Sequence, residues 1–354
     1  MTESNCLIAS LATTVESDEM TNIVLDIDNL VVGLGKKPQG TRIIDGVSLQ
    51  VREGETLCLV GESGSGKSVT SLTVMGLLQK GSLVPSGGSI KLVGEELLTA
   101  SDRRLRQLRA TTMAMIFQEP MTALNPVVPV GRQIDEVLRV HTDLDGRARR
   151  KRILAMMEQV RLPEVERIFA SYPHRLSGGQ RQRIMIAMAL VLEPKLLIAD
   201  EPTTALDVTI QGQILDLIAD LVAERGMSMV LISHDLGVIA ENVQRMMVMY
   251  GGTVIESGAT DAVFTRMGHP YTQGLFRARP RLGARKGTRL KTIAGTVPEL
   301  ADLPAGCTFA DRCAIVEDRC RVALPAAVDV GAGHGVRCIR TDVSMAEAVG
   351  ALGA

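Results

Sequence analysis

Aromatic residues are scarce in this chain. Only 2% of its 354 residues are aromatic, and none is tryptophan. Proteins that bind single-stranded nucleic acid commonly stack the bases on aromatic side chains, and few such side chains are present here. The net charge is −1, from 39 basic and 40 acidic residues, so a broad cationic face for a duplex is not expected either. The composition therefore argues against a nucleic-acid partner.

Long hydrophobic runs are also missing. The longest, from Ile184 to Leu192, has nine residues, whereas a membrane-spanning helix needs about 20. The first residues, MTESNCLIAS, lack the basic start and apolar stretch of a secretory signal. These features predict a cytosolic compartment, where the six cysteines are expected to be buried, reactive or metal-binding rather than paired in disulfides.

The order of apolar patterns predicts an α/β fold. Residues 23–60 contain short apolar runs separated by turns, which is typical of strands. A helical pattern runs from Lys67 to Leu78, and residues 119–194 are mostly helical in pattern. Short strand patterns then return, each after a helical stretch, at residues 196–200, 229–233 and 245–250. This alternation predicts a parallel sheet flanked by helices.

Residues 61–68 read GESGSGKS and match the phosphate-loop pattern G-x-x-x-x-G-K-S/T. The motif follows the apolar run TLCLV and opens a helix, as a phosphate loop requires. Backbone N–H groups and the helix N-terminus would face the phosphates. Lys67 is expected to neutralise the β- and γ-phosphates, and the Ser68 hydroxyl to bind Mg²⁺. The predicted ATP-binding residues are Gly61, Glu62, Ser63, Gly64, Ser65, Gly66, Lys67, Ser68 and Val69.

A pair of carboxylates, Asp200 and Glu201, ends the apolar run LLIAD. A carboxylate at the end of a buried strand beside a phosphate loop is typical of a second Mg²⁺ anchor, which is the role predicted for Asp200. Glu201 is placed to act as the general base on an attacking water. By itself, such a pair is more typical of an N-cap for the next helix, but the phosphate loop favours the catalytic interpretation.

A second helix start suited to phosphate occurs where Leu176, Ser177, Gly178, Gly179 and Gln180 read LSGGQ. The serine hydroxyl and the open backbone amides of a helix N-terminus can bind an anion. A capped helix after a turn would explain the serine and the glycines on their own. Because one nucleotide needs only one such loop, the second predicts a head-to-tail dimer in which it serves the partner's nucleotide.

Together these motifs resemble the ATP-binding cassette (ABC) ATPases over residues 23–258. LSGGQ, between the phosphate loop and LLIADE, is similar to the family signature. Gln118 in MIFQEP resembles the Q-loop glutamine, Asp207 in TALD the D-loop aspartate, and His234 in LISHD the switch histidine that contacts the γ-phosphate. The resemblance implies a P-loop NTPase with a RecA-like parallel-sheet core and a helical signature subdomain at about residues 119–194.

The same resemblance implies a mechanism. Two cassettes close on two ATP molecules, and the LSGGQ residues of each act on the ATP held by the other. The region around Gln118 meets a membrane subunit, which couples closure to transport. The implied catalytic residues are Glu201, His234 and Gln118. The implied Mg²⁺ ligands are Ser68, Gln118 and Asp200.

One departure from the family concerns the base of the nucleotide. ABC ATPases usually place an aromatic residue, which stacks on adenine, about 25 residues before the phosphate loop. The stretch from Leu30 to Arg42 contains no aromatic residue. Leu34 or a neighbour is expected to supply only apolar contact, so the pattern leaves selectivity for ATP over GTP open.

The tail resembles the C-terminal extension of oligopeptide and dipeptide importer ATPases, whose relatives handle nickel and other small solutes. The resemblance lies in HPYT at residues 269–272 and CTFADRC at residues 307–313. Five, six and seventeen residues separate Cys307, Cys313, Cys320 and Cys338. The family implies a 4Fe–4S cluster on these four cysteines. Their chemistry alone fits a zinc site or reduced thiols as well, although the C-x₂-C pairs of common zinc ribbons are absent.

We therefore expect an N-terminal extension at residues 1–22, a nucleotide-binding domain at 23–258 and a Cys-containing extension at 259–354. The expected function is the ATP-hydrolysing subunit of an ABC importer for peptides or related small solutes, peripheral on the cytoplasmic face of the inner membrane. Its expected partners are a second ATPase subunit, two transmembrane permease subunits and, indirectly, an extracytoplasmic solute-binding protein. The alternative is a soluble, non-transport ABC ATPase acting on nucleic acid or ribosomes.

Overall fold

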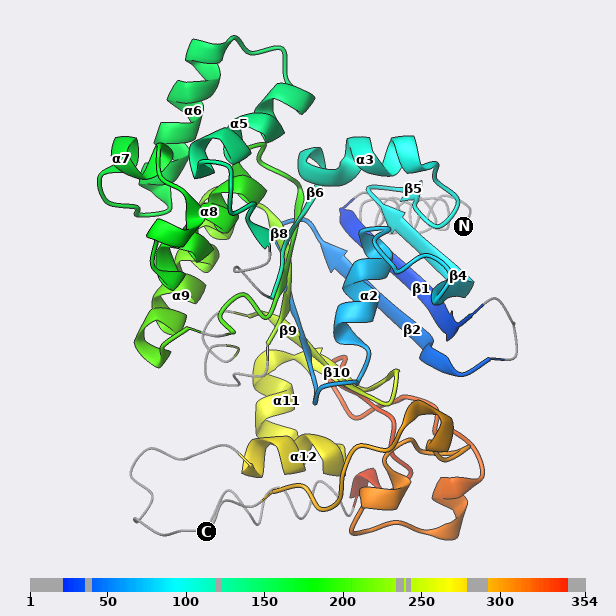
Figure 1. Ribbon diagram of the computed structural model, residues 1–354. Coiled ribbons are helices and arrows are strands. Elements are labelled where there is room, and N and C mark those ends of the chain that lie inside the picture. Colours follow the sequence, from blue (N-terminus) through cyan, green and yellow to red (C-terminus); the bar gives the residue numbers. More distant parts are fainter. Residues whose placement is uncertain are drawn as a thin grey trace, which may run out of the picture.

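A computed structural model gives the fold of the chain as two sheets with helices packed around them (Figure 1). It describes residues 22–35, 40–118, 123–204, 206–233, 239, 243–278 and 292–342. The principal strands are β1 (Ile23–Leu34), β2 (Arg42–Arg52), β3 (Thr56–Val60), β4 (Leu83–Leu92), β5 (Glu95–Glu96), β6 (Met113–Ile116), β7 (Leu196–Asp200), β8 (Ser228–Ile232), β9 (Arg245–Tyr250) and β10 (Thr253–Ala259). The longer helices are α2 (Lys67–Val74), α3 (Asp102–Thr111), α5 (Val130–His141), α6 (Gly146–Gln159), α8 (Gly178–Leu190) and α9 (Val208–Glu224).

The central sheet also includes two short strands near the C-terminus, β11 (Val328–Asp329) and β12 (Gly335–Val336). Its order is β11-β12-β10-β9-β3-β8-β7-β6, and its strands from β9 to β6 are parallel. Successive side chains of a strand point to opposite faces, so each strand feeds two cores. In β3, Cys58 and Val60 pack into one apolar cluster, while Leu57 and Leu59 pack into the other. This arrangement confirms the predicted α/β class with a parallel-sheet core. Cys58 is a fully buried core residue.

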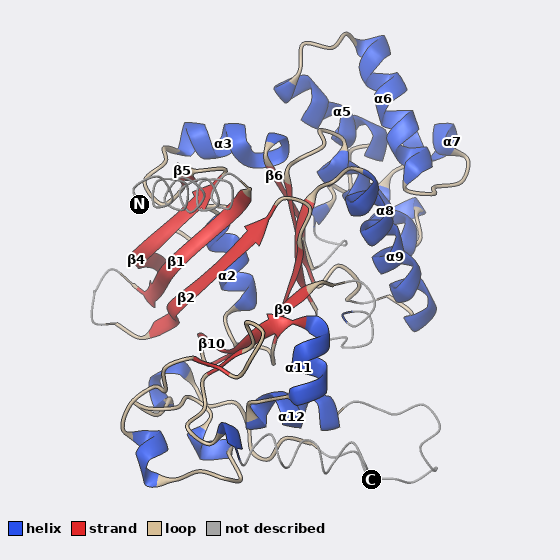
Figure 2. Cartoon of the chain, turned by 180° about the vertical axis from the view of Figure 1, so that it is seen from behind, coloured by secondary structure: helices blue, strands red, loops and turns tan. Residues whose placement is uncertain are grey.

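A second, antiparallel sheet packs over the first. Its order is β2-β1-β4-β5, and β1 pairs with both β2 and β4. The sequence predicts strands in this region but does not assign them to a separate sheet. Helix α2 lies between this sheet and the central one (Figure 2). The apolar side chains that fill this space include Leu30, Ile44 and Val74.

The helical subdomain stands on the far side of the central sheet from α2 (Figure 1). It consists of α5, α6, α8 and the short α7 (Val165–Phe169), followed by a turn of 3₁₀-helix at Pro173–Arg175. Ile134, Ile153 and Ile184 from three of these helices are fully buried in one apolar cluster. Within the described residues, no helix is long and apolar enough to cross a membrane.

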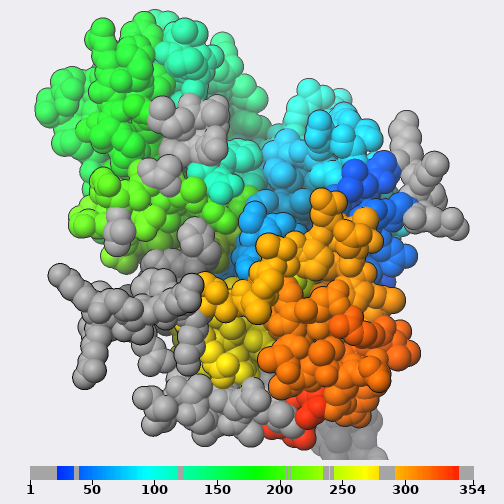
Figure 3. All heavy atoms as spheres, turned by 60° about the horizontal axis from the view of Figure 1, so that its bottom comes forward, coloured from blue at the N-terminus to red at the C-terminus, as the bar shows by residue number. Residues whose placement is uncertain are grey.

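The C-terminal extension is joined to the central sheet. Helices α11 (Thr260–Arg266) and α12 (Pro270–Arg277) come first. The described residues 292–342 then form three 3₁₀ turns and the strands β11 (Val328–Asp329) and β12 (Gly335–Val336). Strand β12 pairs antiparallel with β10, so the extension continues the sheet of the nucleotide-binding domain. In Figure 3 the extension, in orange, borders both the yellow α11–α12 segment and the blue first strands.

One helix is shorter than the sequence predicts. The apolar pattern predicts a helix from Lys67 to Leu78, but α2 ends at Val74. Gly76 follows with φ +61°, and a Cβ there would meet a methyl carbon of Leu105 at 2.8 Å. The chain turns there because a glycine takes up the left-handed conformation and lets α3 approach closely.

Candidate active site

The predicted nucleotide motifs follow the carboxyl ends of parallel strands. The phosphate loop follows β3, Gln118 follows β6, and Glu201 follows β7. In parallel sheets these ends lie along one edge, where ligands commonly bind. The topology therefore brings together side chains that are more than 130 residues apart in the sequence.

The phosphate loop curls tightly between β3 and α2. A Cβ on Gly61 would lie 2.3 Å from the Met249 carbonyl oxygen, and Gly66 adopts φ +104° directly before α2. The side chain of Lys67 folds back over the loop. Its Nζ donates to the carbonyl oxygens of Gly61 and Glu62 at 2.8 and 2.9 Å. Burial lowers the pKa of Lys67, against the raising effect of nearby carboxylates, with Glu201 first among them.

Two of the three predicted Mg²⁺ ligands, Ser68 and Asp200, lie side by side. The hydroxyl of Ser68 donates to Oδ1 of Asp200 at 3.0 Å. Burial raises the pKa of Asp200, which the Ser68 hydrogen bond partly offsets. A buried carboxylate with a raised pKa gains from a bound cation, and Mg²⁺ prefers hard oxygen ligands. The donors present therefore fit the ion, which would neutralise charge on the β- and γ-phosphates.

Glu201 faces Gln118 across the same edge. Its Oε2 accepts hydrogen bonds from Gln118 Nε2 at 2.9 Å and from Thr204 Oγ1 at 3.0 Å. Its backbone has φ +44°, an uncommon conformation for glutamate and one that clusters at functional sites. The alternative role of an N-cap is wrong for this pair, because helix α9 begins after Asp207. Thr204 is the first residue of the TALD motif, and the sequence analysis gave it no role beside Glu201.

The LSGGQ turn lies at the start of α8, in the helical subdomain. Ser177 caps this helix through a reciprocal pair of hydrogen bonds with Gln180, so the structural interpretation as a capped helix is confirmed. Ser177 and Gly178 are exposed. Figures 1 and 2 both show α8 and α2 on opposite sides of the central sheet. The structure thus holds two separate helix starts suited to phosphate in one chain.

His234 and Asp207 are two predicted site residues for which the structure shows no contact within the site. His234 lies outside the described residues. Asp207 is exposed and immediately precedes α9, but its side chain does not cap that helix. Leu34, the residue expected to contact the base, is 49% exposed at the end of β1.

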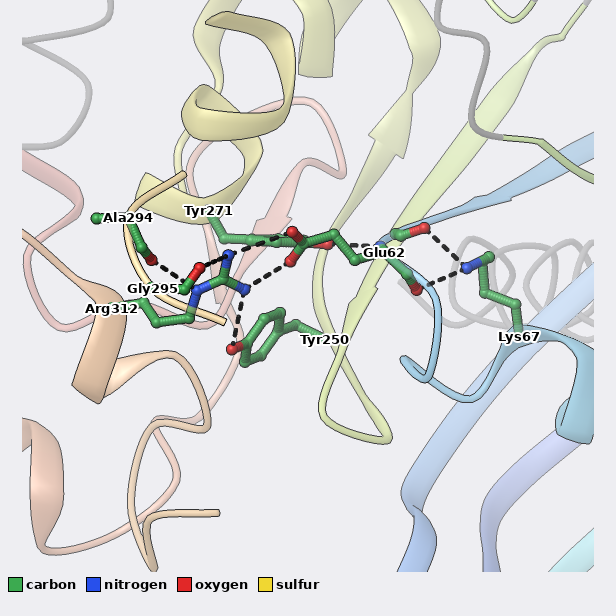
Figure 4. A network of polar contacts seen from close by, with 8 residues as sticks. Glu62, Lys67, Tyr250, Tyr271, Ala294, Gly295 and Arg312 are labelled. Carbon is green, nitrogen blue, oxygen red and sulfur yellow. Dashed lines mark hydrogen bonds and ion pairs between the residues drawn. The ribbon is translucent and has the colours of Figure 1, made fainter. Parts of the chain in front are cut away.

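Two residues from the C-terminal half of the chain contact the phosphate loop. The hydroxyl of Tyr271, in the HPYT motif, accepts a hydrogen bond from the Glu62 amide at 2.7 Å. Arg312, in the CTFADRC motif, forms an ion pair with the Glu62 carboxylate at 2.6 Å (Figure 4). No phosphate-loop pattern points to either residue. The only sequence signal was that both lie in the motifs that distinguish the tail.

The four tail cysteines line one small cavity of about 20 Å³, room for roughly one water molecule. None of these four cysteines is in a disulfide. Burial, and then the neighbouring cysteines, raise the pKa values of Cys307 and Cys338 to about 11. Among the described residues, no set of three or more His, Cys, Asp or Glu side chains has an arrangement that could hold a metal ion. Nothing in the structure or the comparisons supports the predicted 4Fe–4S cluster itself.

A buried histidine also lines this cavity. His269 Nδ1 accepts from the Tyr271 amide at 3.1 Å, which places the proton of the neutral ring on Nε2. Burial lowers the pKa of His269 to about 4, so the ring is neutral at physiological pH. Nε2 is buried without a hydrogen-bond partner. The wall of the cavity thus carries a buried N–H donor beside the four cysteines.

Comparison with known proteins gives two family matches. Residues 44–204 match the model for ABC transporters, and residues 255–320 match the model for the C-terminal region of oligopeptide/dipeptide transporters. The second match includes three of the four tail cysteines, with Cys338 beyond its end.

Relatives and solved structures agree with these matches. A Brucella ovis protein named as a peptide import ATP-binding protein is 47% identical over 327 residues, which cover 90% of this chain and 97% of the relative. A Sinorhizobium fredii protein named as a peptide ABC transporter ATP-binding protein is 43% identical, covering 93% and 98%. A dimeric, post-hydrolysis structure of the ATP-binding cassette MJ0796, bound to ADP and Pi, has 29% identity and a TM-score of 0.59, covering 67% of this chain and 98% of that one.

A further solved structure supports the same fold. It is cbiO1 from Clostridium perfringens, part of the ABC transporter complex cbiONQ, with 27% identity and a TM-score of 0.59. It covers 70% of this chain and 92% of that one. The fold and the family matches make this chain an ABC-type ATPase. The chain belongs to the family of ABC transporter ATP-binding proteins, among the members that carry the oligopeptide/dipeptide transporter C-terminal region.

Proposed function

We propose that this chain is the energy-coupling ATPase subunit of an ABC importer for peptides or related small solutes. The observation that carries the proposal is the combination, in one chain, of the nucleotide site with the oligopeptide/dipeptide C-terminal region. The relatives named for peptide import support the solute class. ATP binding closes a dimer of cassettes, and hydrolysis reopens it.

Within this function the site residues have distinct roles. The loop from Gly61 to Val69 holds the phosphates through backbone N–H groups, and Lys67 supplies a positive charge beside them. Ser68, Asp200 and Gln118 would hold Mg²⁺, which would neutralise charge on the phosphates. Glu201 accepts a proton from the attacking water, oriented by its hydrogen bonds to Gln118 and Thr204. His234 contacts the γ-phosphate, and Asp207 lies at the dimer contact.

The proposed partners follow from the proposed role. A second cassette, identical or related, completes the two ATP sites, and two transmembrane permease subunits receive the motion. The chain would then be peripheral on the cytoplasmic face of the inner membrane, with an extracytoplasmic solute-binding protein acting through the permeases. The sequence composition leaves nucleic acid outside this set of partners.

The test is the subunit composition of the tagged chain, purified anaerobically from detergent-solubilised native membranes and identified by mass spectrometry. We expect two polytopic membrane proteins and either a second cassette or a second copy of this chain. Recovery of the chain only in the soluble fraction, with ribosomes or nucleic acid, would contradict the importer role and support the soluble ABC ATPase instead.

The LSGGQ turn allows a test of the composite site. Ser177→Asp keeps a good helix N-cap but places a negative charge against the partner's ATP, so we expect ATP-dependent dimerisation to weaken at least about tenfold. Ser177→Asn, which also caps well and is neutral, is the matched control. Both are measured by sedimentation with Mg–ATP in a Glu201→Gln background, alone and with any second cassette found in the membranes. Equal dimerisation of the two variants would contradict the role of this turn.

We also propose that Cys307, Cys313, Cys320 and Cys338 hold a metal centre, a 4Fe–4S cluster by family resemblance. The proposal rests on the family resemblance; the structure adds only that the four cysteines line one cavity together with His269. The cavity has room for about one water, so the thiols must move apart to admit a cluster. Bound metal would supply a cross-link that stabilises a small tail with little core of its own.

The cysteine proposal predicts a loss of metal on a single substitution. In Cys313→Ser, purified anaerobically, we expect iron and acid-labile sulfide to fall from near stoichiometric to near zero, because one of four ligands is lost. Cys6→Ser and Cys58→Ala, outside the motif, are the controls and should retain the metal. If the wild-type protein contains zinc and no sulfide, the centre is a zinc site rather than a cluster. If the wild-type protein contains no metal, the proposal is wrong.

A further inference from the structure

The C-terminal extension reaches the phosphate loop through Arg312. Its side chain is only 5% exposed, and both terminal nitrogens contact the Glu62 carboxylate, at 2.6 and 3.2 Å. The guanidinium is held on its other sides by the carbonyl oxygens of Ala294 and Gly295 and by the Tyr250 hydroxyl. A two-pronged, charge-assisted pair with a buried arginine is stronger than an exposed ion pair, which water and salt screen.

Glu62 is held at every polar group. Its carboxylate accepts from Arg312, its amide donates to the Tyr271 hydroxyl at 2.7 Å, and its carbonyl accepts from Lys67 Nζ at 2.9 Å. Figure 4 shows Arg312 and Lys67 on opposite sides of Glu62. The second residue of the phosphate loop is thus fixed between the extension and the lysine that meets the phosphates.

The charges explain why the loop needs this support. A carboxylate in a phosphate loop repels the phosphates of ATP and competes for Lys67. Arg312 pairs with that carboxylate and draws it to the side away from Lys67, which leaves the lysine to the nucleotide. Without Arg312, Glu62 would be a partly buried, unpaired acid next to the phosphate site, which is costly in a low-dielectric environment.

We propose that Arg312 is a positioning residue of the phosphate loop, through which the C-terminal extension sets the affinity of this ATPase for nucleotide phosphates. The proposal rests on the assignment of residues 61–69 to ATP. It gives the extension a role in the ATP site itself, separate from any metal that its cysteines hold.

The test is the ATP affinity of the full chain in a Glu201→Gln background, measured by calorimetry with Mg²⁺. Loss of a charge-assisted, two-pronged pair predicts that Arg312→Ala raises the Kd for ATP about tenfold. Arg321→Ala is the matched control, because Arg321 pairs with Asp311 on the exposed surface of the same extension. We expect its Kd to stay within about twofold of the parent.

A double-mutant cycle separates positioning from general stability. Once Glu62→Gln has removed the carboxylate, Arg312→Ala is expected to change the Kd less than about threefold. Arg312→Lys keeps the positive charge but not the two-pronged geometry of the guanidinium, so it is expected to fold and to weaken ATP binding about threefold. It replaces Arg312→Ala in the affinity measurement if the alanine variant is unstable.

Two results would overturn the proposal. One is an unchanged Kd in Arg312→Ala and Arg312→Lys, with only the melting temperature of the nucleotide-free chain lowered. The other is an equal loss of affinity with and without the Glu62 carboxylate, because Arg312 would then not act through Glu62. Failure of the parent chain to bind ATP would instead contradict the assignment of the loop.

Discussion

Replacing Glu201 with glutamine is expected to lower the ATPase turnover number at least about a hundredfold while Mg–ATP still binds, because general-base catalysis contributes at least that much. Glutamine has the same shape, and it can still accept hydrogen bonds from Gln118 and Thr204 through its carbonyl oxygen. The strained backbone at φ +44° is common to both side chains. The substitution therefore removes little besides the ability to take a proton from water.

The measurement pairs steady-state phosphate release with the equilibrium affinity for ATP. Glu224→Gln, at the exposed end of α9, makes the same chemical change away from the site and should leave both quantities unchanged. Near-normal turnover in Glu201→Gln would remove Glu201 from the role of general base. A large loss of ATP affinity together with turnover would show that its main contribution is to binding.

Lys67→Ala is expected to raise the Kd for ATP about a hundredfold. In the nucleotide-free structure, the buried ammonium group of Lys67 donates hydrogen bonds to the Gly61 and Glu62 carbonyl oxygens and to Ser65 Oγ at 3.2 Å. In the nucleotide complex these donors face phosphate oxygens. Two charge-assisted hydrogen bonds, at about 1.5 kcal/mol each, account for the expected loss.

The affinity is measured by calorimetry in the Glu201→Gln background, so that hydrolysis does not interfere. Lys80→Ala is the control. Lys80 lies shortly after α2, and it forms an exposed ion pair with Asp102. An ATP affinity in Lys67→Ala within about threefold of the parent would contradict the phosphate-binding role. Unlike Glu201→Gln, this variant should lose turnover through binding, and saturating ATP should restore part of it.

The sequence by itself determined the local features of this protein, namely individual strands and short nucleotide-binding motifs. Strands β7 and β9 lie where the apolar runs predict them, because short runs of apolar and β-branched residues bounded by polar turns have few alternatives. The phosphate loop, the Asp200–Glu201 pair and the LSGGQ turn were readable because each is a short pattern tied to a strand end or a helix start. The closeness of Ser68 and Asp200, 132 positions apart, was expected because both motifs follow the carboxyl ends of parallel strands in one kind of fold.

Only the tertiary structure decided the long-range contacts. The pair between Arg312 and Glu62 joins residues 250 positions apart, and the bond from Glu62 to Tyr271 spans 209. No spacing rule reaches so far, because such contacts depend on how the sheets stack and on where β12 joins the edge of the central sheet. The gathering of four cysteines and His269 around one cavity has the same origin. Local chemistry made the nucleotide motifs readable from the sequence, whereas packing alone placed the extension against them.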